Sequence, residues 1–336
     1  MNVSESIQII KSATQASLDL LFYASITLIP IGFVLNLLSL VIFSRKKFRS
    51  LRIGIIYRAI TIADLVAILF CFLIYFSPTI NNDLQIASDI SCKLLNLFMR
   101  TCAQSSSWIN LLLTIDRFLL IKYSSKKFKL FHNETLLPLI IVGIFIFIAM
   151  ANSSVLWFNV IERQSFNQTT KICMGSQTAL FFRDLMAILF RTVLPFILIF
   201  ILNTILIKAF VEQKQKVSAQ KTMRKEMIFA FSIIIMNSFY FVNLIPIGVS
   251  LIFYNIYQND PVKFSIVTFY SFLAMYITAL NNCFPFIINL IFNKIFYREF
   301  FDFLGIWFPK AYLNKSSLEN SKKSAAQSST AKQTTK

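Results

Sequence analysis

Seven separated apolar runs, each 20 or more residues long, constrain this chain more than any other feature. They cover about 20–44, 53–77, 90–121, 136–158, 179–210, 223–254 and 264–291. A helix needs about 20 apolar residues to cross the hydrocarbon core of a bilayer. Strands of a transmembrane barrel would alternate with period two over about 10 residues, and the runs show no such alternation. The sequence therefore predicts an all-α fold, a bundle of seven transmembrane helices.

Charge is distributed unevenly between the two sides of such a bundle. Of the 33 Lys and Arg residues, 25 lie in the tail, in the segments after the first, third and fifth runs, or at the adjoining helix ends. Only seven of the 15 acids lie there, so this side carries the whole net charge of +18. Loops rich in Lys and Arg stay in the cytoplasm. We therefore expect an extracellular N-terminus and a cytoplasmic C-terminus.

The runs divide the chain into three parts. Residues 1–19 are expected to form an extracellular N-terminus, residues 20–304 the seven-helix domain, and residues 305–336 a cytoplasmic tail. The tail is rich in Ser, Lys, Ala, Thr and Gln and has no apolar run, which is typical of disorder. The sequons at Asn2 and Asn167 fall on the outer side, so both are expected to carry glycans.

Residues 293–304 predict a short amphipathic helix just before the tail. Phe296, Phe300, Phe303 and Leu304 recur at helical spacing, with charged residues between them. A helix of this kind lies in the membrane interface with its apolar face turned inward. We expect it to be a cytoplasmic eighth helix.

Most of the spans carry a polar residue or a proline at a characteristic position. Cys92 opens the third span and Asp116-Arg117-Phe118 closes it, so that Arg117 follows Cys92 by 25 residues. The remaining positions are Asn36, Asp64, Pro195, Pro246 and Pro285, in spans 1, 2, 5, 6 and 7. Together this spacing resembles the rhodopsin-like (class A) G-protein-coupled receptors over about residues 20–304. The three prolines match the kink prolines of that family.

The resemblance implies a cell-surface receptor in the plasma membrane. Such a receptor binds an extracellular ligand and activates a heterotrimeric G protein by opening the cytoplasmic ends of helices 3 and 6. The chain resembles a divergent member. The helix-7 motif Asn-Pro-x-x-Tyr is Phe284-Pro285-Phe286-Ile287-Ile288 here, and the Trp before the helix-6 proline is Leu244.

The resemblance assigns roles at both ends of the third span. It pairs Cys92 with Cys173 in a disulfide, for which the alternative is two free thiols. It places Asp116, Arg117 and Glu226 in contacts that favour the inactive state. The alternative is that these charges only mark the cytoplasmic side.

Asp64 is the most deeply placed acid, and acids inside membranes are functional by default. The resemblance implies a sodium ion at Asp64, with oxygens from Asn36, Ser106, Asn281 and Asn282. The alternative is a protonated Asp64 that hydrogen bonds to neighbouring amides. No other cofactor or metal is expected.

Charged residues also lie in the outer halves of spans 3 and 5, where the family binds ligands. Arg100, Arg183 and Arg191 suit a carboxylate or phosphate, while Asp184 lies seven residues before Arg191 and so on the same helix face. We expect a pocket for an anionic group, such as a peptide carboxylate or an acidic lipid; the alternative is internal salt bridges. The other expected pocket residues are Met99, Tyr240 and Thr278.

Two of these residues exclude ligand types. Met99 stands where aminergic receptors carry an Asp, so an amine ligand is disfavoured. Thr278 stands where opsins carry a Lys, so no retinal Schiff base is expected there.

Other classes of protein fit the sequence less well. The chain has one His and no metal-ligand cluster or nucleophile arrangement, so an enzyme is not expected. The basic residues cap membrane spans, which argues against nucleic acid and suggests contact with membrane lipids. The Ser and Thr residues of the tail suggest a receptor kinase and arrestin as further partners. The remaining alternative is a polytopic transporter or channel, although paired halves are not evident.

Overall fold

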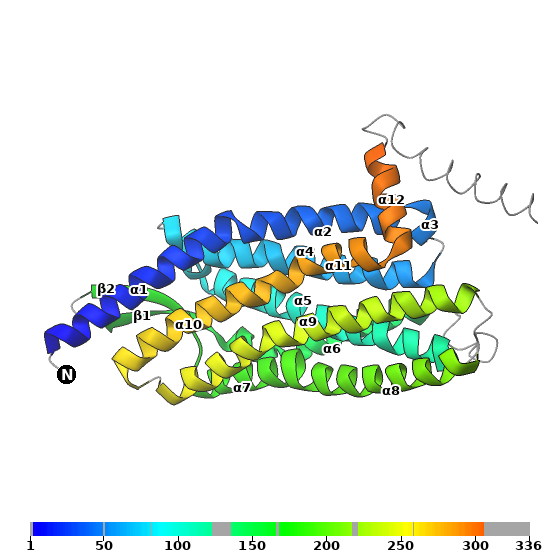
Figure 1. Ribbon diagram of the computed structural model, residues 1–336. Coiled ribbons are helices and arrows are strands. Elements are labelled where there is room, and N and C mark those ends of the chain that lie inside the picture. Colours follow the sequence, from blue (N-terminus) through cyan, green and yellow to red (C-terminus); the bar gives the residue numbers. More distant parts are fainter. Residues whose placement is uncertain are drawn as a thin grey trace, which may run out of the picture.

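The computed structural model describes residues 3–49, 51–80, 82–122, 136–165, 168–216, 221–257 and 259–305. Long helices run along one another, and a two-stranded hairpin lies at one end of the bundle (Figure 1). The last helix, α12 (Lys294–Gly305), turns across the other end. We refer to these as the hairpin end and the α12 end.

Helices make up most of the described chain, which confirms the all-α prediction. They are α1 (Val3–Ile26), α2 (Leu28–Ser44), α3 (Lys46–Arg49), α4 (Arg52–Phe76), α5 (Asp89–Lys122), α6 (Leu136–Ala151), α7 (Gln177–Ala187), α8 (Leu194–Lys216), α9 (Lys221–Tyr257), α10 (Pro261–Ala279), α11 (Phe284–Phe292) and α12. Strands β1 (Asn159–Ser165) and β2 (Gln168–Met174) pair antiparallel, with Asn159 opposite Met174.

Five helical stretches of the described chain are long and apolar enough to cross a membrane. They are Ser4–Ser44, Arg52–Ile80, Gln177–Lys208, Phe231–Tyr254 and Pro261–Phe292. Helix α6 is apolar but has only 16 residues. Helix α5 has 34 residues, and many of its polar side chains, such as Gln104, Ser107 and Asn110, are buried. These two complete the seven-helix bundle.

The first helical stretch begins earlier than the hydropathy pattern predicts. Helix α1 starts at Val3 rather than near residue 20 and packs against α10. Ile10, Ala13, Ser17 and Leu21 follow one another at helical spacing on its less exposed face. The polar residues between them hide this periodicity from a search for continuous apolar runs.

The fifth and seventh runs are interrupted rather than regular. Pro195 has no N–H, so the carbonyl of Arg191 loses its helical donor, and the helix widens into a π-helical turn over Ile188–Val193. In the seventh run, a 3₁₀ turn at Leu280–Asn282 precedes Pro285 in the first turn of α11. Pro246 lies inside α9. The π-helical turn and the 3₁₀ turn rotate the residues that follow them, and so change which side chains face the centre of the bundle.

A disulfide fastens the hairpin to the bundle. Cys92, in the first turn of α5, is joined to Cys173 on β2. Cys92 is fully buried in a cluster with Val155, Phe158 and Ala179. The disulfide therefore holds β2 against the end of α5.

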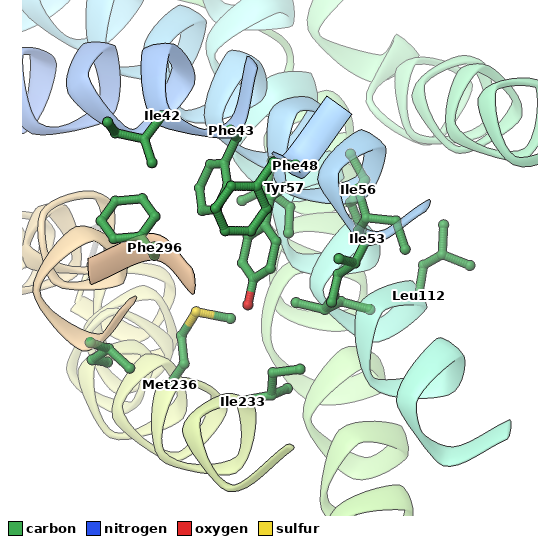
Figure 2. Packing of buried hydrophobic residues seen from close by; sticks show 14 of the residues in the cluster. Ile42, Phe43, Phe48, Ile53, Ile56, Tyr57, Leu112, Ile233, Met236 and Phe296 are labelled. Carbon is green, nitrogen blue, oxygen red and sulfur yellow. The ribbon is translucent and has the colours of Figure 1, made fainter. Parts of the chain in front are cut away.

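The main apolar core lies toward the α12 end (Figure 2). Phe43 stacks on Tyr57 with ring centroids 4.5 Å apart, and the rings of Phe48 and Phe296 approach Phe43 to 5.0 and 5.1 Å. Met236 of α9 closes the cluster from the opposite side. Because Phe296 belongs to α12, this core anchors the predicted eighth helix by its apolar face.

A buried carboxylate provides the second anchor of α12. Glu299 is 3% exposed, and its carboxylate lies 2.7 Å from Arg45 Nε and 2.5 Å from Lys47 Nζ. Burial alone would raise the pKa of Glu299, but hydrogen bonds from Lys47 and Arg45 outweigh it and hold the pKa below 4.5. The same pairing raises the pKa of Lys47.

Replacing Glu299 with glutamine should lower the free energy of unfolding by about 1–2 kcal/mol, because two cations lose their partner. The lowered pKa means that this contribution is complete above pH 4.5 and is lost as pH falls through the folded-state pKa. Thermal unfolding of the purified chain at pH 7 and at lower pH measures both effects. Asp302→Asn is the matched control, because Asp302 is half-exposed and lies 3.7 Å from Lys47. Equal midpoints for Glu299→Gln and Asp302→Asn would contradict the prediction.

Candidate ligand pocket and polar core

A cavity of about 150 Å³ opens between the helices on the side of the hairpin end. Its walls come from α1, α2, α4, α5, α9, α10 and the π-helical turn. Five of the seven predicted pocket residues line it, namely Met99, Arg100, Arg191, Tyr240 and Thr278. The spans that the sequence pattern selected for ligand binding therefore do enclose a space.

Arg183 and Asp184 are not among the residues that line this cavity. Asp184 is 2% exposed, and its two oxygens accept hydrogen bonds from Arg183 Nε at 2.7 Å and Nη2 at 2.9 Å. The Arg183 guanidinium also lies 5.6 Å from the centre of the Phe158 ring. Arg183 thus has a carboxylate partner of its own, as the alternative of internal salt bridges expects for this pair.

Arg100 and Arg191 are placed differently. Both side chains have a buried Nε without a hydrogen-bond partner, and neither makes an ion pair with any residue that the structure describes. Arg191 does make a hydrogen bond with the Tyr240 hydroxyl. The cavity therefore contains two guanidinium groups without a paired anion among the described residues.

A hydrogen-bonded network continues from Tyr240 toward the middle of the bundle. The Tyr240 hydroxyl bonds to Ser107 of α5, and its backbone carbonyl accepts from Asn281 Nδ2 at 3.3 Å. Asn243 Nδ2 donates to Asn281 Oδ1 at 2.8 Å, and the Thr278 hydroxyl donates to the Asn243 carbonyl at 3.1 Å. The sequence pattern missed Ser107 and Asn243, although Asn243 lies one turn from Tyr240 on the same helix.

Asp64 lies at the deep end of the large cavity and also borders a second, smaller one of about 10 Å³. Ser106, Asn110 and Asn281 line the small cavity with it, and Ser106 hydrogen bonds to Asp64. Asn110 Oδ1 is buried without a hydrogen-bond partner. The sequence pattern missed Asn110, which lies one helical turn after Ser106. A carboxylate and further oxygens around a space of ion size suit a hard cation such as sodium.

The other two residues predicted for this network form a bridge between helices. Asn36 Nδ2 donates to the carbonyl of Gly32 at 2.8 Å and to that of Asn282 at 2.5 Å. This contact ties α2 to the 3₁₀ turn before Pro285, and Asn282 lines the large cavity. Asn36 and Asn282 are not among the residues that line the smaller cavity beside Asp64.

At the α12 end, Asp116 is shared between two cations. Asp116 Oδ1 lies 3.4 Å from Arg52 Nε, and Asp116 Oδ2 lies 3.8 Å from Arg117 Nη2. Arg117 is 7% exposed and lies near Tyr57. Glu226 belongs to α9, but its side chain lies outside the described part of the chain. Arg52 was not predicted for this site.

The positions where the chain departs from the family pattern are filled with apolar packing. The ring of Phe284 lies 3.9 Å from that of Phe239, and Ile288 is buried in the main core. Leu244 is 2% exposed and packs with Ile247 and Ala274. These residues replace polar groups with carbon contacts between α9, α10 and α11.

Other predicted sites are not covered by the structure. Asn2 and Asn167, the expected glycosylation sites, lie outside the described residues. Within the described residues, no three His, Cys, Asp or Glu side chains come together as ligands for a metal ion.

Comparison with protein families agrees with this arrangement of helices. Residues 35–287 match the model of the 7 transmembrane receptor (rhodopsin family). No curated protein matches the chain. The match covers most of the chain, and the chain therefore belongs to the rhodopsin family of seven-transmembrane receptors. It is a multi-pass membrane protein and a receptor of the class that binds extracellular ligands and couples to G proteins.

Proposed function

We propose that the chain is a plasma-membrane receptor whose hairpin end faces outward and whose α12 end faces the cytoplasm. The excess of Lys and Arg in the segments after spans 1, 3 and 5 and in the tail supports this orientation. The ligand enters the cavity at the hairpin end. The heterotrimeric G protein binds between the helices at the α12 end, next to Arg117.

One observation carries the proposal: Tyr240 of α9 connects the cavity to the polar core. Tyr240 lines both cavities, hydrogen bonds to Ser107 of α5 and accepts from Asn281. It lies on α9, on the cytoplasmic side of Pro246. A ligand that binds one arrangement of this network more tightly than another shifts the equilibrium between them.

In this mechanism, Arg117 moves from its contact with Asp116 to the G protein. Ligand binding rearranges α9 around Pro246, and the cytoplasmic ends of α5 and α9 separate. Glu226, on α9, holds Arg117 in the inactive state. Ion pairs at wet helix ends contribute about 0–1 kcal/mol, which a ligand readily overcomes.

Nucleotide loading on a G protein tests the proposal without a known ligand. Basal GTPγS binding to heterotrimers reconstituted with the full chain should rise with Glu226→Ala and disappear with Arg117→Ala. Lys11→Ala, which removes an exposed cation at the hairpin end, is the control and should change nothing. Absence of loading from every variant, at normal surface expression, would contradict the proposal. Substrate flux through the reconstituted chain without loading would favour a transporter or channel.

We also propose that Asp64, Ser106 and Asn110 hold a sodium ion, which supplies positive charge beside the carboxylate. The Asn110 oxygen without a partner and the ion-sized cavity support this assignment. Replacing the choline chloride of the buffer with sodium chloride should raise the thermal midpoint of the purified chain by a few degrees. Asp64→Asn should abolish that shift, whereas Asp83→Asn, outside the cavity, should keep it. An equal response to both salts would favour a protonated Asp64.

The flanking segments extend the proposal to further partners. Glycans on Asn2 and Asn167 would lie on the outer side. Ser and Thr residues of the tail offer sites for a receptor kinase and, once phosphorylated, for arrestin. The basic segments near the α12 end favour contact with anionic lipids.

A further inference from the structure

The large cavity combines two cations with a wall made mostly of carbon, and this combination identifies its ligand. The inference rests on the proposed function only in taking this cavity as the ligand site. Arg100 of α5 and Arg191 of the π-helical turn both line the cavity, and the Nε atom of each is buried. A buried guanidinium is costly without an anion, and its planar fork matches the two oxygens of a carboxylate or phosphate.

Arg183 differs from these two arginines because it has an acidic partner within the protein. Its guanidinium holds Asp184 through two hydrogen bonds and lies outside the cavity lining. Arg100 and Arg191 have buried Nε atoms without such partners among the described residues. The counterion of these two side chains is therefore expected to come from the ligand.

Much of the rest of the lining is apolar, although hydroxyl and amide groups also contribute, among them Gln104, Tyr276 and Asn282. Leu21 and Ala24 of α1, Leu28 of α2, Leu251 of α9 and Met275 of α10 form an apolar wall. A peptide backbone against this wall would leave its N–H and C=O groups without hydrogen bonds, at a cost of about 1–3 kcal/mol each. A hydrocarbon chain makes favourable contacts with the same surface.

Asp64 sets the direction in which such a ligand lies. It is the acidic residue in the lining, and whether it is ionised or holds the proposed sodium ion, it attracts an anion less than two guanidinium groups do. The anionic group is therefore held at Arg100 and Arg191, and the apolar part extends toward α1.

We propose that the receptor binds a single-chain amphiphile with one anionic head group, a carboxylate or a phosphate, and a hydrocarbon tail. The head group lies between Arg100 and Arg191, and the tail lies against the wall that contains Leu21 and Ala24. This assignment goes beyond a general preference for anions, because the apolar wall selects a lipid over a peptide.

Binding of radiolabelled lauric acid to the full chain in phosphatidylcholine nanodiscs tests the assignment, with empty nanodiscs as background. We expect saturable binding that unlabelled lauric acid or dodecyl phosphate displaces. Dodecanol and dodecylamine share the tail and should not compete. The stronger competitor of the two anions identifies the head group. Competition by dodecanol equal to that of lauric acid would overturn the proposal, as would displacement by a short peptide with a free carboxyl end where lauric acid does not bind.

Variants of the lining residues test which part of the cavity contacts the head group and which part contacts the tail. Arg100→Gln and Arg191→Gln should each weaken lauric acid binding by about tenfold or more, since each removes a charge-assisted hydrogen bond. Arg100→Lys should recover part of the affinity, which shows that the loss does not come from misfolding. Lys11→Gln, which removes an exposed cation of α1 outside the lining, should stay within about twofold of the unmodified chain. Ala24→Phe fills the tail wall and should shift the preference toward shorter chains. Unchanged affinity in both Gln variants would overturn the proposal.

The same preparations test the proposed ligand class and the proposed receptor function independently of each other. Lauric acid that binds through Arg100 and Arg191 without promoting GTPγS loading would contradict the proposed function and leave the ligand class intact. Loading driven by another compound and unaffected by Arg100→Gln and Arg191→Gln would overturn the ligand class and support the receptor function.

Discussion

Replacing Cys92 with serine is expected to destabilise the chain more than any other single change described above. The disulfide links residues 81 positions apart, and the chain-entropy model gives roughly 4–5 kcal/mol for a closed loop of that size. Asn96 Nδ2 lies 3.4 Å from Cys173 Sγ, and Asp89 Oδ1 accepts from the Val160 N–H at 2.7 Å. These weaker contacts do not replace the covalent link. We expect the thermal midpoint to fall by roughly 10 °C and ligand affinity to fall with it.

The double variant Cys92→Ser/Cys173→Ser should behave like the single one, and reduction of the unmodified chain should reproduce both. Cys102→Ala is the control, because Cys102 is a buried thiol outside the disulfide, and its loss should cost about 1–2 kcal/mol. Surface expression and circular dichroism of the purified chain measure the outcome. A double variant with the midpoint of the unmodified chain would show that the disulfide adds no stability.

Gly54→Ala should have the second largest effect. Gly54 lies in the first turn of α4, where a Cβ would overlap the backbone carbonyl of Phe48. A backbone atom cannot rotate away as a side chain can, so α3 and the buried Phe48 ring must shift. We expect a loss of about 3 kcal/mol and weaker coupling to the G protein, because Arg52 and its partner Asp116 lie next to this turn.

Two other glycines provide matched controls for Gly54→Ala. A Cβ at Gly143 or Gly248 meets no atom within 4 Å. Both lie inside helices, where alanine is favoured over glycine by about 1 kcal/mol. Gly143→Ala and Gly248→Ala should therefore leave the thermal midpoint unchanged or raise it slightly. If Gly54→Ala had the same thermal midpoint as these two control variants, the predicted clash with the Phe48 carbonyl would be wrong.

Features that depend on periodicity were predictable from the sequence. The spacing of Phe296 and Phe300 indicates a helix with one apolar face, and α12 packs both rings against the main core. The spacing between Cys92 and Arg117 indicates the family, because both residues lie on one helix and their separation reflects its length. Both inferences use distances along a single element.

Features that depend on contacts between elements were harder to predict. The seven-residue spacing of Asp184 and Arg191 implies one helix face, but the π-helical turn at Ile188–Val193 changes the register, and Asp184 binds Arg183 instead. The hairpin was not predicted, since its short strands are polar and are held by Cys173 and by each other. Asn110 and Asn243 acquire a role only when α5, α9 and α10 come together.

The polar face of α5 also bears on how the chain is made. Gln104, Ser107, Asn110 and Thr114 are buried; Gln104 bonds to Asn152, just after α6, and Ser107 and Thr114 bond to residues of α9. A nascent segment with this many polar groups is a poor substrate for lateral release into lipid. We therefore expect α5 to leave the translocation channel together with a neighbouring span rather than by itself, so that its polar groups find their partners as the bundle forms.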